Sequence, residues 1–436
     1  MKTLKSFCRT IQPGEENTFV GIQEHAGLFS VIFPLGYNLG ETENEIRNDL
    51  LLLIRVLSGF SKSEWFSDSN NIDGMMSDSL PFFSYRVIWD DYVQNSYFQE
   101  STVNNKGAYD GTIDWKRTIA KEEPYFVDNS LVFLNYQIRK KIPLYNTPIF
   151  FISQYCVYLA SKMIGWLYGY ETLPTNPLKM GLKEAIAIVR EHISNTFNDR
   201  KRLLLSSMEN VLKNEELLQQ QESRIRLWGT YRFEYVWEGM IDTHFGIKEK
   251  NRYFPQAFWV INQDSKKFKS SVMEPDTIMI IQDNEEASCY VLDAKYYKYG
   301  VTNNRYHLPP TSSICKQIVY GEYAAQYWGN ENIFNAFIMP YQSIDASSEW
   351  VKQIGFALTN WCSESFPYSR VQGVLIDMKK IMQVYSRNNS LDLQILARII
   401  RTASSKQSNV KNNTTRLPKG VLAADPEFPY MVNKNL

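Results

Sequence analysis

The 436-residue chain has few of the residues that mark common metal and redox sites. Its four histidines, His25, His192, His244 and His307, lack the paired spacing of a zinc or HNH-type hydrolase site. Its five cysteines are scattered without a CxxC pair. This pattern predicts reduced thiols in a cytoplasmic protein and argues against a zinc ribbon or a disulfide framework.

The sequence also lacks an excess of charge, a nucleotide-binding loop and a long apolar run. Lys plus Arg and Asp plus Glu both number 47, so any contact with nucleic acid must come from local basic patches. No GxxxxGK[ST] occurs, which argues against nucleotide hydrolysis by this chain. Residues 1–17 have no signal-peptide core, and polar residues interrupt the apolar region 147–170. We therefore expect a buried helix at 147–170 and no membrane span.

Apolar periodicity predicts a mixed α/β protein. Strands are expected over 18–35, and a helix over 43–58 begins with a capping box formed by Thr42 and Glu45. Further helices are expected over 148–168 and 182–213. The predicted organisation comprises an N-terminal DNA- or partner-binding domain at 1–180, a helical connector at 181–225, a catalytic domain at 226–403 and a flexible tail at 404–436.

Two short apolar runs separated by polar residues form the central motif of the sequence. Residues 277–281 and 288–292 are rich in strand formers, which predicts a β-hairpin. Asp276 follows a proline at the expected start of the first strand. Asp293 and Lys295 are two residues apart near the end of the second, so their side chains leave the same face. Antiparallel pairing therefore predicts that the three side chains converge.

Two carboxylates at one point repel each other unless a cation neutralises them. Mg²⁺ takes oxygen ligands, typically one or two carboxylates with waters and a substrate phosphate. A neighbouring lysine can hold an attacking water or neutralise charge that develops on a phosphate oxygen. The three residues thus suit phosphodiester hydrolysis with Mg²⁺ as cofactor. The alternative at this point is an ordinary hairpin with a surface ion pair.

Predicted helices flank the hairpin on both sides. In the helix expected over 231–241, Glu234 and Glu238 are four residues apart and share a face opposite an apolar stripe. A second helix is expected to begin at a hydroxyl cap within 311–313. The three- and four-residue spacing places the following residues on one side of this second helix: Lys316, Gln317 and Tyr320. One interpretation is a functional polar face. The other, preferred for Tyr320, is one side of an ordinary amphipathic helix.

A further segment, GTIDWKRTI at 111–119, places Trp115 beside Lys116 and Arg117 after a turn glycine. We expect a strand or short helix with Trp115 anchored. One interpretation is a buried tryptophan beside solvated charges. The other is a basic and aromatic patch that contacts DNA or a partner subunit.

These motifs together resemble a known family. Pro275-Asp276 followed by Asp293-Ala294-Lys295 is similar to the PD-(D/E)xK nuclease signature. The phrases FE-x-x-WE at 233–238, KQ-x-x-Y at 316–320 and GTIDWKRTI resemble segments of LlaJI-type and McrC-like restriction endonucleases. The resemblance implies an αβββαβ nuclease core in the C-terminal domain.

The resemblance also implies roles for individual residues. Asp276 and Asp293 would bind Mg²⁺ together with the Ala294 carbonyl, and Lys295 would orient or activate water. Glu234 or Glu238 would complete the site, and the polar side of the helix that carries KQ-x-x-Y would stand near the metal, within reach of DNA. Glu234 is the first choice, because the Phe-Glu pair matches the family phrase more closely. Glu274, which precedes the PD pair, is a competing ligand.

The implied function is a restriction endonuclease that cleaves double-stranded DNA. McrC-like proteins work with a separate AAA+ GTPase, so the resemblance implies an McrB-like partner; a homodimer is a further expected assembly. Two alternatives stay open. One is a repair or transposon-end nuclease with the same core, and the other is a non-catalytic DNA- or partner-binding subunit.

Overall fold

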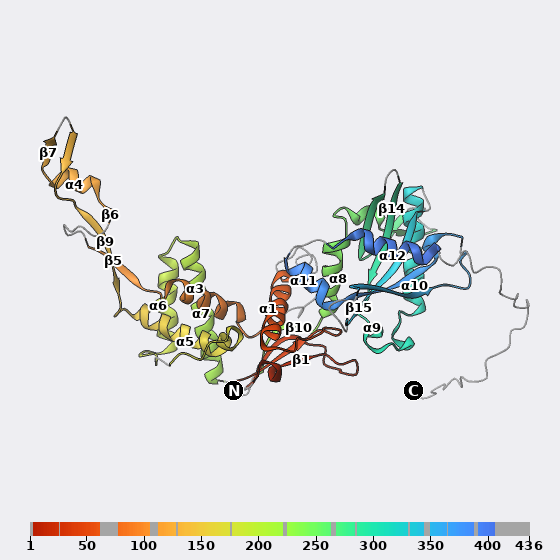
Figure 1. Cartoon of the computed structure of the whole chain (residues 1–436), viewed down its shortest axis with the longest axis horizontal. Coiled ribbons are helices and arrows are strands. Elements are labelled where there is room, and N and C mark those ends of the chain that lie inside the picture. Colours follow the sequence, from red (N-terminus) through yellow and green to blue (C-terminus); the bar gives the residue numbers. More distant parts are fainter. Residues whose placement is uncertain are drawn as a thin grey trace, which may run out of the picture.

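The computed structural model shows a chain of mixed helices and strands, which confirms the α/β class (Figure 1). Most of the polar segment 61–79 and of the predicted tail fall outside the described residues, as do Asp110 and Gly111. The structure describes residues 3–25, 27–61, 77–104, 112–127, 130–174, 177–220, 225–262, 267–283, 286–329, 332–343, 349–363, 365–387 and 391–405.

The N-terminal sheet contains a strand from much later in the chain. Its strands, in the order β1-β3-β2-β10-β4, are Cys8–Thr10 (β1), Leu28–Phe33 (β3), Val20–His25 (β2), Arg226–Thr230 (β10) and Ser77–Asp78 (β4). Arg226 Nε of β10 donates to Glu24 Oε2 of β2 at 2.6 Å, and both side chains are buried. Gly21 and Gly229 are opposite each other with φ of 145° and 150°. A Cβ on either would lie 2.2 Å from a backbone oxygen of the other strand, so the close approach of β2 and β10 at this position requires glycine.

Helix α1 (Glu43–Phe60) joins this sheet to the C-terminal half. Thr42 Oγ1 accepts from Glu45 N at 3.3 Å and Thr42 N donates to Glu45 Oε2 at 2.9 Å, which confirms the predicted capping box. Four further helices pack together beside the sheet: α3 (Phe82–Asn95), α5 (Pro148–Tyr168), α6 (Leu182–Ser194) and α7 (Asp199–Gln220). α5 is the buried helix predicted at 147–170. Among the described helices, none combines the length and apolar character required to cross a bilayer.

A thin arm extends from the helices at one end of the molecule (Figure 1). Its elements are β5 (Glu100–Asn104), β6 (Thr112–Ile113), α4 (Trp115–Lys121), β7 (Pro124–Val127), β8 (Ser130–Phe133) and β9 (Ile138–Leu144). The prediction of an anchored Trp115 is wrong, because this side chain is 54% exposed. It meets Phe133 and Tyr136 only edge-on. An arm of two- and three-stranded sheets with one short helix has too little depth to bury a tryptophan.

The C-terminal sheet has the order β13-β14-β15-β17-β16, with parallel β14-β15-β17 at its centre. The strands are β13 (Thr277–Asp283), β14 (Glu286–Ala294), β15 (Ile333–Tyr341), β16 (Val351–Ala357) and β17 (Val371–Asp377). One face packs on α8 (Phe233–Phe245), α11 (Met378–Arg387) and α12 (Leu393–Ser405), and the other on α10 (Thr311–Trp328). Both faces are covered, so β15 and β17 are buried at every position.

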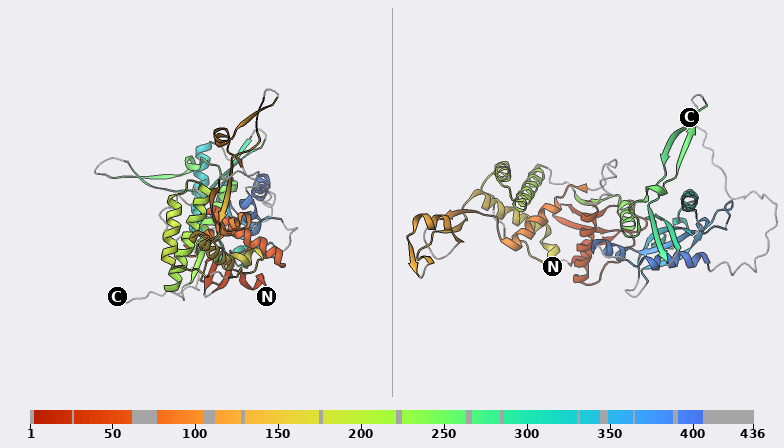
Figure 2. Two further views of the ribbon diagram at one scale, coloured as in Figure 1. Left: turned by 90° about the vertical axis from the view of Figure 1, so that its left-hand side faces the viewer. Right: turned by 90° about the horizontal axis from the view of Figure 1, so that it is seen from above.

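Shorter elements connect these parts. They are η1 (Leu4–Phe7), η2 (Lys250–Tyr253), β11 (Gln256–Val260), β12 (Lys267–Val272), α9 (Tyr299–Thr302), η3 (Arg305–His307) and η4 (Pro367–Ser369). β11 and β12 form a hairpin that projects away from the C-terminal sheet (Figure 2).

The two halves meet through polar contacts as well as a shared apolar core. Leu35 N donates to the Tyr296 hydroxyl at 2.7 Å, which ties the end of the N-terminal sheet to the residue after Lys295. Asp49 of α1 is buried and forms an ion pair with Lys379 of α11 at 2.7 Å. Asp49 also accepts from the Tyr37 hydroxyl at 2.8 Å.

Candidate active site

The hairpin register brings the two aspartates together. β13 pairs antiparallel with β14, and Thr277 is opposite Leu292. Asp276 therefore lies beside the end of β14, where Ala294 N donates to Asp276 Oδ2 at 3.0 Å. The Asp276 and Asp293 carboxyl groups are within hydrogen-bonding reach of each other. Residues separated by 17 positions in the sequence thus meet because alternate apolar side chains fix the strand pairing.

Lys295 is the counter-ion of this pair. Its Nζ donates to Asp293 Oδ1, and the Asp293 side chain is only 5% exposed. Burial, followed by the charge of Asp293, raises the pKa of Asp276 well above its ordinary value, and Lys295 only partly opposes this shift. Burial lowers the pKa of Lys295, but the two aspartates outweigh it and raise that pKa overall. One lysine therefore does not fully neutralise the two carboxylates.

Glu238 rather than Glu234 faces the two aspartates. Burial raises the pKa of Glu238 to about 7, and the neighbouring charges that act on it include Lys295, Asp293 and Lys316. Glu234 lies one helical turn earlier on α8, where it pairs with Arg232 and its side chain is 37% exposed. The preference for Glu234 is therefore not supported by the geometry. The phrase match favoured Glu234, and helical spacing could not correct this choice, because it places both glutamates on the same face of the helix.

The residues on α10 hold the hairpin in place. Gln317 is fully buried, and its Nε2 donates to Val291 O of β14 at 2.7 Å. The buried Tyr320 hydroxyl donates to Glu274 O at 2.9 Å. Lys316 is exposed and lies over the Tyr320 ring at 5.4 Å. Gln317 and Tyr320 therefore brace the strands that carry the aspartates, and Lys316 is the member of this group that is open to solvent.

The start of α10 differs from the prediction. Its N-cap is Pro310 and no side chain caps the helix, so the predicted hydroxyl cap at 311–313 is wrong. Thr311 is already the first helical residue, because the proline before it holds the extended backbone from which the helix starts.

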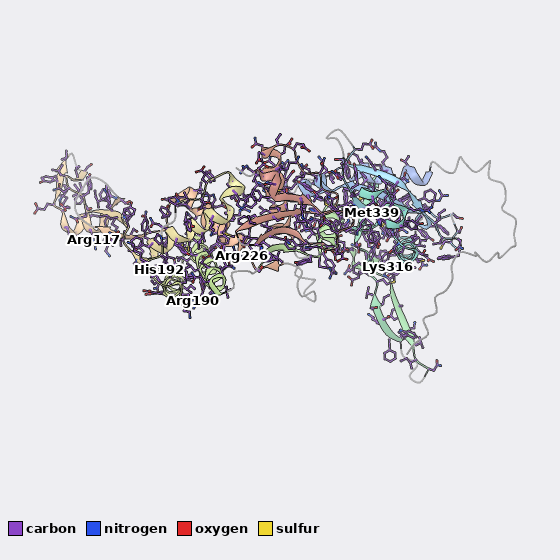
Figure 3. The ribbon with its side chains drawn as sticks, turned by 90° about the horizontal axis from the view of Figure 1, so that it is seen from below. Arg117, Arg190, His192, Arg226, Lys316 and Met339 are labelled. Atoms are coloured by element: carbon purple, nitrogen blue, oxygen red, sulfur yellow. The ribbon has the colours of Figure 1, made fainter. Side chains whose placement is uncertain are left out.

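Two of the sequence candidates lie away from this site. Trp115 and Lys116 belong to α4 in the arm, and Figure 3 shows the neighbouring Arg117 at the opposite end of the molecule from Lys316. The Glu274 side chain is exposed, and its backbone oxygen is the group that Tyr320 holds. Asp276 is therefore the first carboxylate of the site.

Lys250, which belongs to no sequence motif, contacts the backbone of Asp276. Lys250 Nζ donates to Asp276 O at 2.5 Å and to Asp242 Oδ2 of α8 at 2.9 Å. Its position 26 residues before Asp276, in the 3-10 turn η2, belongs to no motif. Only its place in the fold shows the contact.

The donor set suits some metals better than others. Among the described residues, no three His, Cys, Asp or Glu side chains are grouped as a metal site of protein ligands would require. The site instead offers two carboxylates, of which one has a strongly raised pKa, and a backbone carbonyl at Ala294, the last residue of β14. Mg²⁺ commonly binds through one or two carboxylates and keeps its waters, so the residues fit Mg²⁺ and do not fit a structural zinc.

The fold and the site first indicate a class: a mixed α/β protein whose paired carboxylates and lysine suit hydrolysis of a phosphodiester. The sequence model described as LlaJI restriction endonuclease matches residues 19–385. The chain belongs to this LlaJI restriction endonuclease family, and it is accordingly a nuclease of a restriction system. This confirms the resemblance that the sequence motifs suggested.

The chain is similar to two individual proteins at low sequence identity. The chain is 22% identical over 412 residues to the type II restriction enzyme BsuMI component YdjA of Bacillus subtilis (strain 168), which covers 91% of this chain and 86% of the relative. Among solved structures, it is similar to a chain in a half-complex of Thermococcus gammatolerans McrB AAA+ hexamers with bound McrC. That match has 12% identity and a TM-score of 0.30, over 85% of this chain and 81% of the other.

Proposed function

We propose that the chain is a Mg²⁺-dependent endonuclease that hydrolyses phosphodiester bonds in double-stranded DNA, and that it does so at defined sites. The observation that carries the proposal is the meeting of Asp276 and Asp293 at the end of the β13–β14 hairpin, with Lys295 on Asp293. We take this unit as the PD-(D/E)xK core that the resemblance implies. Helix α8 before the β13–β14 hairpin, and α10 followed by the parallel strand β15 after it, support this assignment. The order departs from αβββαβ in one respect, since two strands of the C-terminal sheet precede α10 and not three.

In this proposal Asp276, Asp293 and the Ala294 carbonyl would hold Mg²⁺. When bound, the ion would neutralise the two carboxylates and polarise the scissile phosphate. Burial and then the charge of Asp293 raise the pKa of Asp276, and the cost of two buried negative charges is the physical reason for a cation at this point. Glu238, next to the pair on α8, would complete the site.

The two lysines of the site, Lys295 and Lys316, would act on the water and on the phosphates. Lys295 Nζ, fixed by Asp293, would orient the attacking water or donate to the phosphate oxygen on which charge grows. Lys316 is exposed beside the site and would bind a neighbouring phosphate. Gln317 and Tyr320 would act only as supports for the hairpin, since both are buried.

We also propose an AAA+ GTPase subunit as a partner. This rests on the resemblance to McrC-like proteins, and the lack of a P-loop in the sequence is consistent with a separate nucleotide-hydrolysing subunit. Association into a homodimer would place two such sites on the two strands of a duplex.

Plasmid cleavage tests the catalytic proposal. With Mg²⁺ present, Asp293→Ala and Lys295→Ala should each lower the rate at least about 100-fold, because each removes a group that acts directly on the charge of the reaction. The assay compares both variants with wild type, with and without a co-encoded GTPase, and with EDTA as the metal-free control. Equal cleavage by all three proteins would rule out the catalytic assignment.

A further inference from the structure

The hairpin formed by β11 and β12, called the ribbon from here on, stands clear of the rest of the described chain. Figures 2 and 3 show it leaving the C-terminal half as two long strands. In agreement with these views, β11 and β12 pack chiefly on each other. At its base Met273 N donates to Pro255 O at 3.0 Å, and Gln256 Nε2 donates to Ser270 O at 3.2 Å.

The two faces of the ribbon carry different side chains. Phe258 is opposite Lys269 and Val260 is opposite Lys267, so these four share one face. Trp259 is opposite Phe268 on the other face. All six are exposed, and Trp259 is 70% exposed. Neither face is covered by any other described part of the chain.

A two-stranded ribbon with aromatic side chains on both faces is only marginally stable in water by itself. A partner that covered one face would leave the other aromatic side exposed, whereas a groove covers both. The major groove of B-DNA is wide enough for a two-stranded β-ribbon, and rows of phosphates line it on both sides. The shape of the ribbon therefore matches a duplex better than it matches a flat protein surface.

The charge of the ribbon agrees with this partner. The whole chain has no net charge, but residues 256–272 contain three lysines and a single aspartate. In the described strands, Lys267 and Lys269 stand on the same face with no acidic residue among them. A local positive face on a neutral protein is the pattern expected where phosphates are bound.

The ribbon is also continuous with the candidate active site. Only three residues lie between Val272 and Asp276, a path of at most about 13 Å. Within that path the Glu274 carbonyl is held by Tyr320, and Lys316 lies over the Tyr320 ring. A duplex that contacts the ribbon would therefore lie within reach of both Lys316 and the aspartates.

We propose that the ribbon inserts into the groove of the DNA duplex and fixes its position relative to the site. Lys267 and Lys269 contact phosphates, and Trp259 and Phe268 make apolar contacts with base edges in the groove. This inference rests on the proposed function, because it takes double-stranded DNA as the substrate. It adds the element that holds the duplex.

The test measures binding apart from cleavage. Full-length protein is titrated into a fluorescein-labelled 40-bp duplex of random sequence in EDTA, at several salt concentrations, and fluorescence anisotropy is read. The variant Lys267→Ala/Lys269→Ala should bind about tenfold more weakly, and its log–log salt slope should fall by about 2. Trp259→Ala should also weaken binding about tenfold and leave the slope unchanged. Lys183→Ala on α6, the loss of an exposed lysine elsewhere on the protein, is the control for the lysine variant and should bind like wild type.

The outcomes separate this proposal from the catalytic one. Wild-type affinity and slope in the double-lysine variant would overturn the ribbon proposal, even if cleavage by wild type depends on Asp293. So would a change of oligomeric state in Trp259→Ala by sedimentation velocity with unaltered DNA binding, because the ribbon would then bind protein. Lost binding in the ribbon variants, with cleavage unaffected by Asp293→Ala, would uphold the ribbon and reject the catalytic assignment.

Discussion

The burial of the Glu238 side chain decides its pKa and distinguishes it from Glu234. The sequence offered two glutamates on one helix face; helical periodicity could not rank them, and the family phrase ranked Glu234 first. The difference arises because β14 places Asp293 and Lys295 opposite the second helical turn of α8, which is a tertiary contact. Lys250 escaped prediction for the same reason, since its two partners lie in other elements.

The raised pKa of Glu238 gives a prediction for the metal-free protein. Its folded pKa of about 7 lies above its ordinary value of 4.5, so the protonated form favours folding. This contribution is complete below about pH 4.5 and is lost as the pH rises through 7, a change of about 3 kcal/mol. Glu238→Gln cannot ionise and should keep it. In EDTA, the variant should gain at least about 3 °C in melting temperature relative to wild type between pH 5 and pH 8.

The control for this measurement is Glu234→Gln, whose side chain pairs with Arg232 outside the carboxylate cluster. Its melting temperature should not rise relative to wild type over the same pH range. A constant difference between Glu238→Gln and wild type from pH 5 to pH 8 would contradict the burial of Glu238 beside the aspartates.

Individual elements were predictable where the signal was local. The capping box of α1, the apolar stripe of α8 and the β13–β14 hairpin each depend on residues within one turn or one strand pair, and all three are present in the structure. The ribbon was missed although QAFWV and KFKSSV surround the polar turn NQDSK, a hairpin signal. Exposure of its aromatic side chains could not be read from the sequence, just as it could not for Trp115.

The residues of α10 can be separated into those that support the β13–β14 hairpin and one that would contact DNA. Tyr320→Phe removes the hydrogen bond to Glu274 O and should destabilise the protein by about 1 kcal/mol. Gln317→Ala removes a fully buried amide and should destabilise it by about 2–3 kcal/mol, through an unpaired Val291 carbonyl and a cavity. Melting temperatures in EDTA report both changes.

The matched control is Lys316→Ala on the same helix, an exposed residue whose loss should leave the melting temperature nearly unchanged and weaken duplex binding. For Tyr320→Phe and Gln317→Ala we expect the reverse: lower stability with binding to the 40-bp duplex retained. Weakened DNA binding at wild-type stability in either of these two variants would show that α10 presents them to the substrate.

At the scale of the whole molecule, the sequence gives no signal for the closure of the N-terminal sheet. β10 pairs with β2 about 200 residues earlier, through Gly229 against Gly21 and Arg226 with Glu24. Pairing between two strands so far apart in the sequence leaves no pattern in the local sequence of either strand. The predicted division at 180, 225 and 403 stays a prediction, although β10 places residues 226–230 in the N-terminal sheet.

The junction between the halves gives a prediction at this scale. Lys379→Ala would leave Asp49 buried without its ion-pair partner, which should destabilise the protein by about 2–3 kcal/mol. Lys380→Ala, the exposed neighbouring lysine, should change stability by less than about 0.5 kcal/mol. Thermal melting of the two variants makes the comparison, and equal melting temperatures would show that the Asp49–Lys379 pair contributes nothing to the junction.

The hydrogen bond between Leu35 N and the Tyr296 hydroxyl joins the N-terminal sheet to the covalent neighbour of Lys295. A twist of that sheet, which also carries the helices and the distant arm, therefore pulls on the backbone that positions the Lys295 ammonium group. A force applied at the far end of the protein would therefore be transmitted through this hydrogen bond to the place where a DNA strand would be cut. The same bond limits how far the two halves can separate before the lysine is displaced from Asp293.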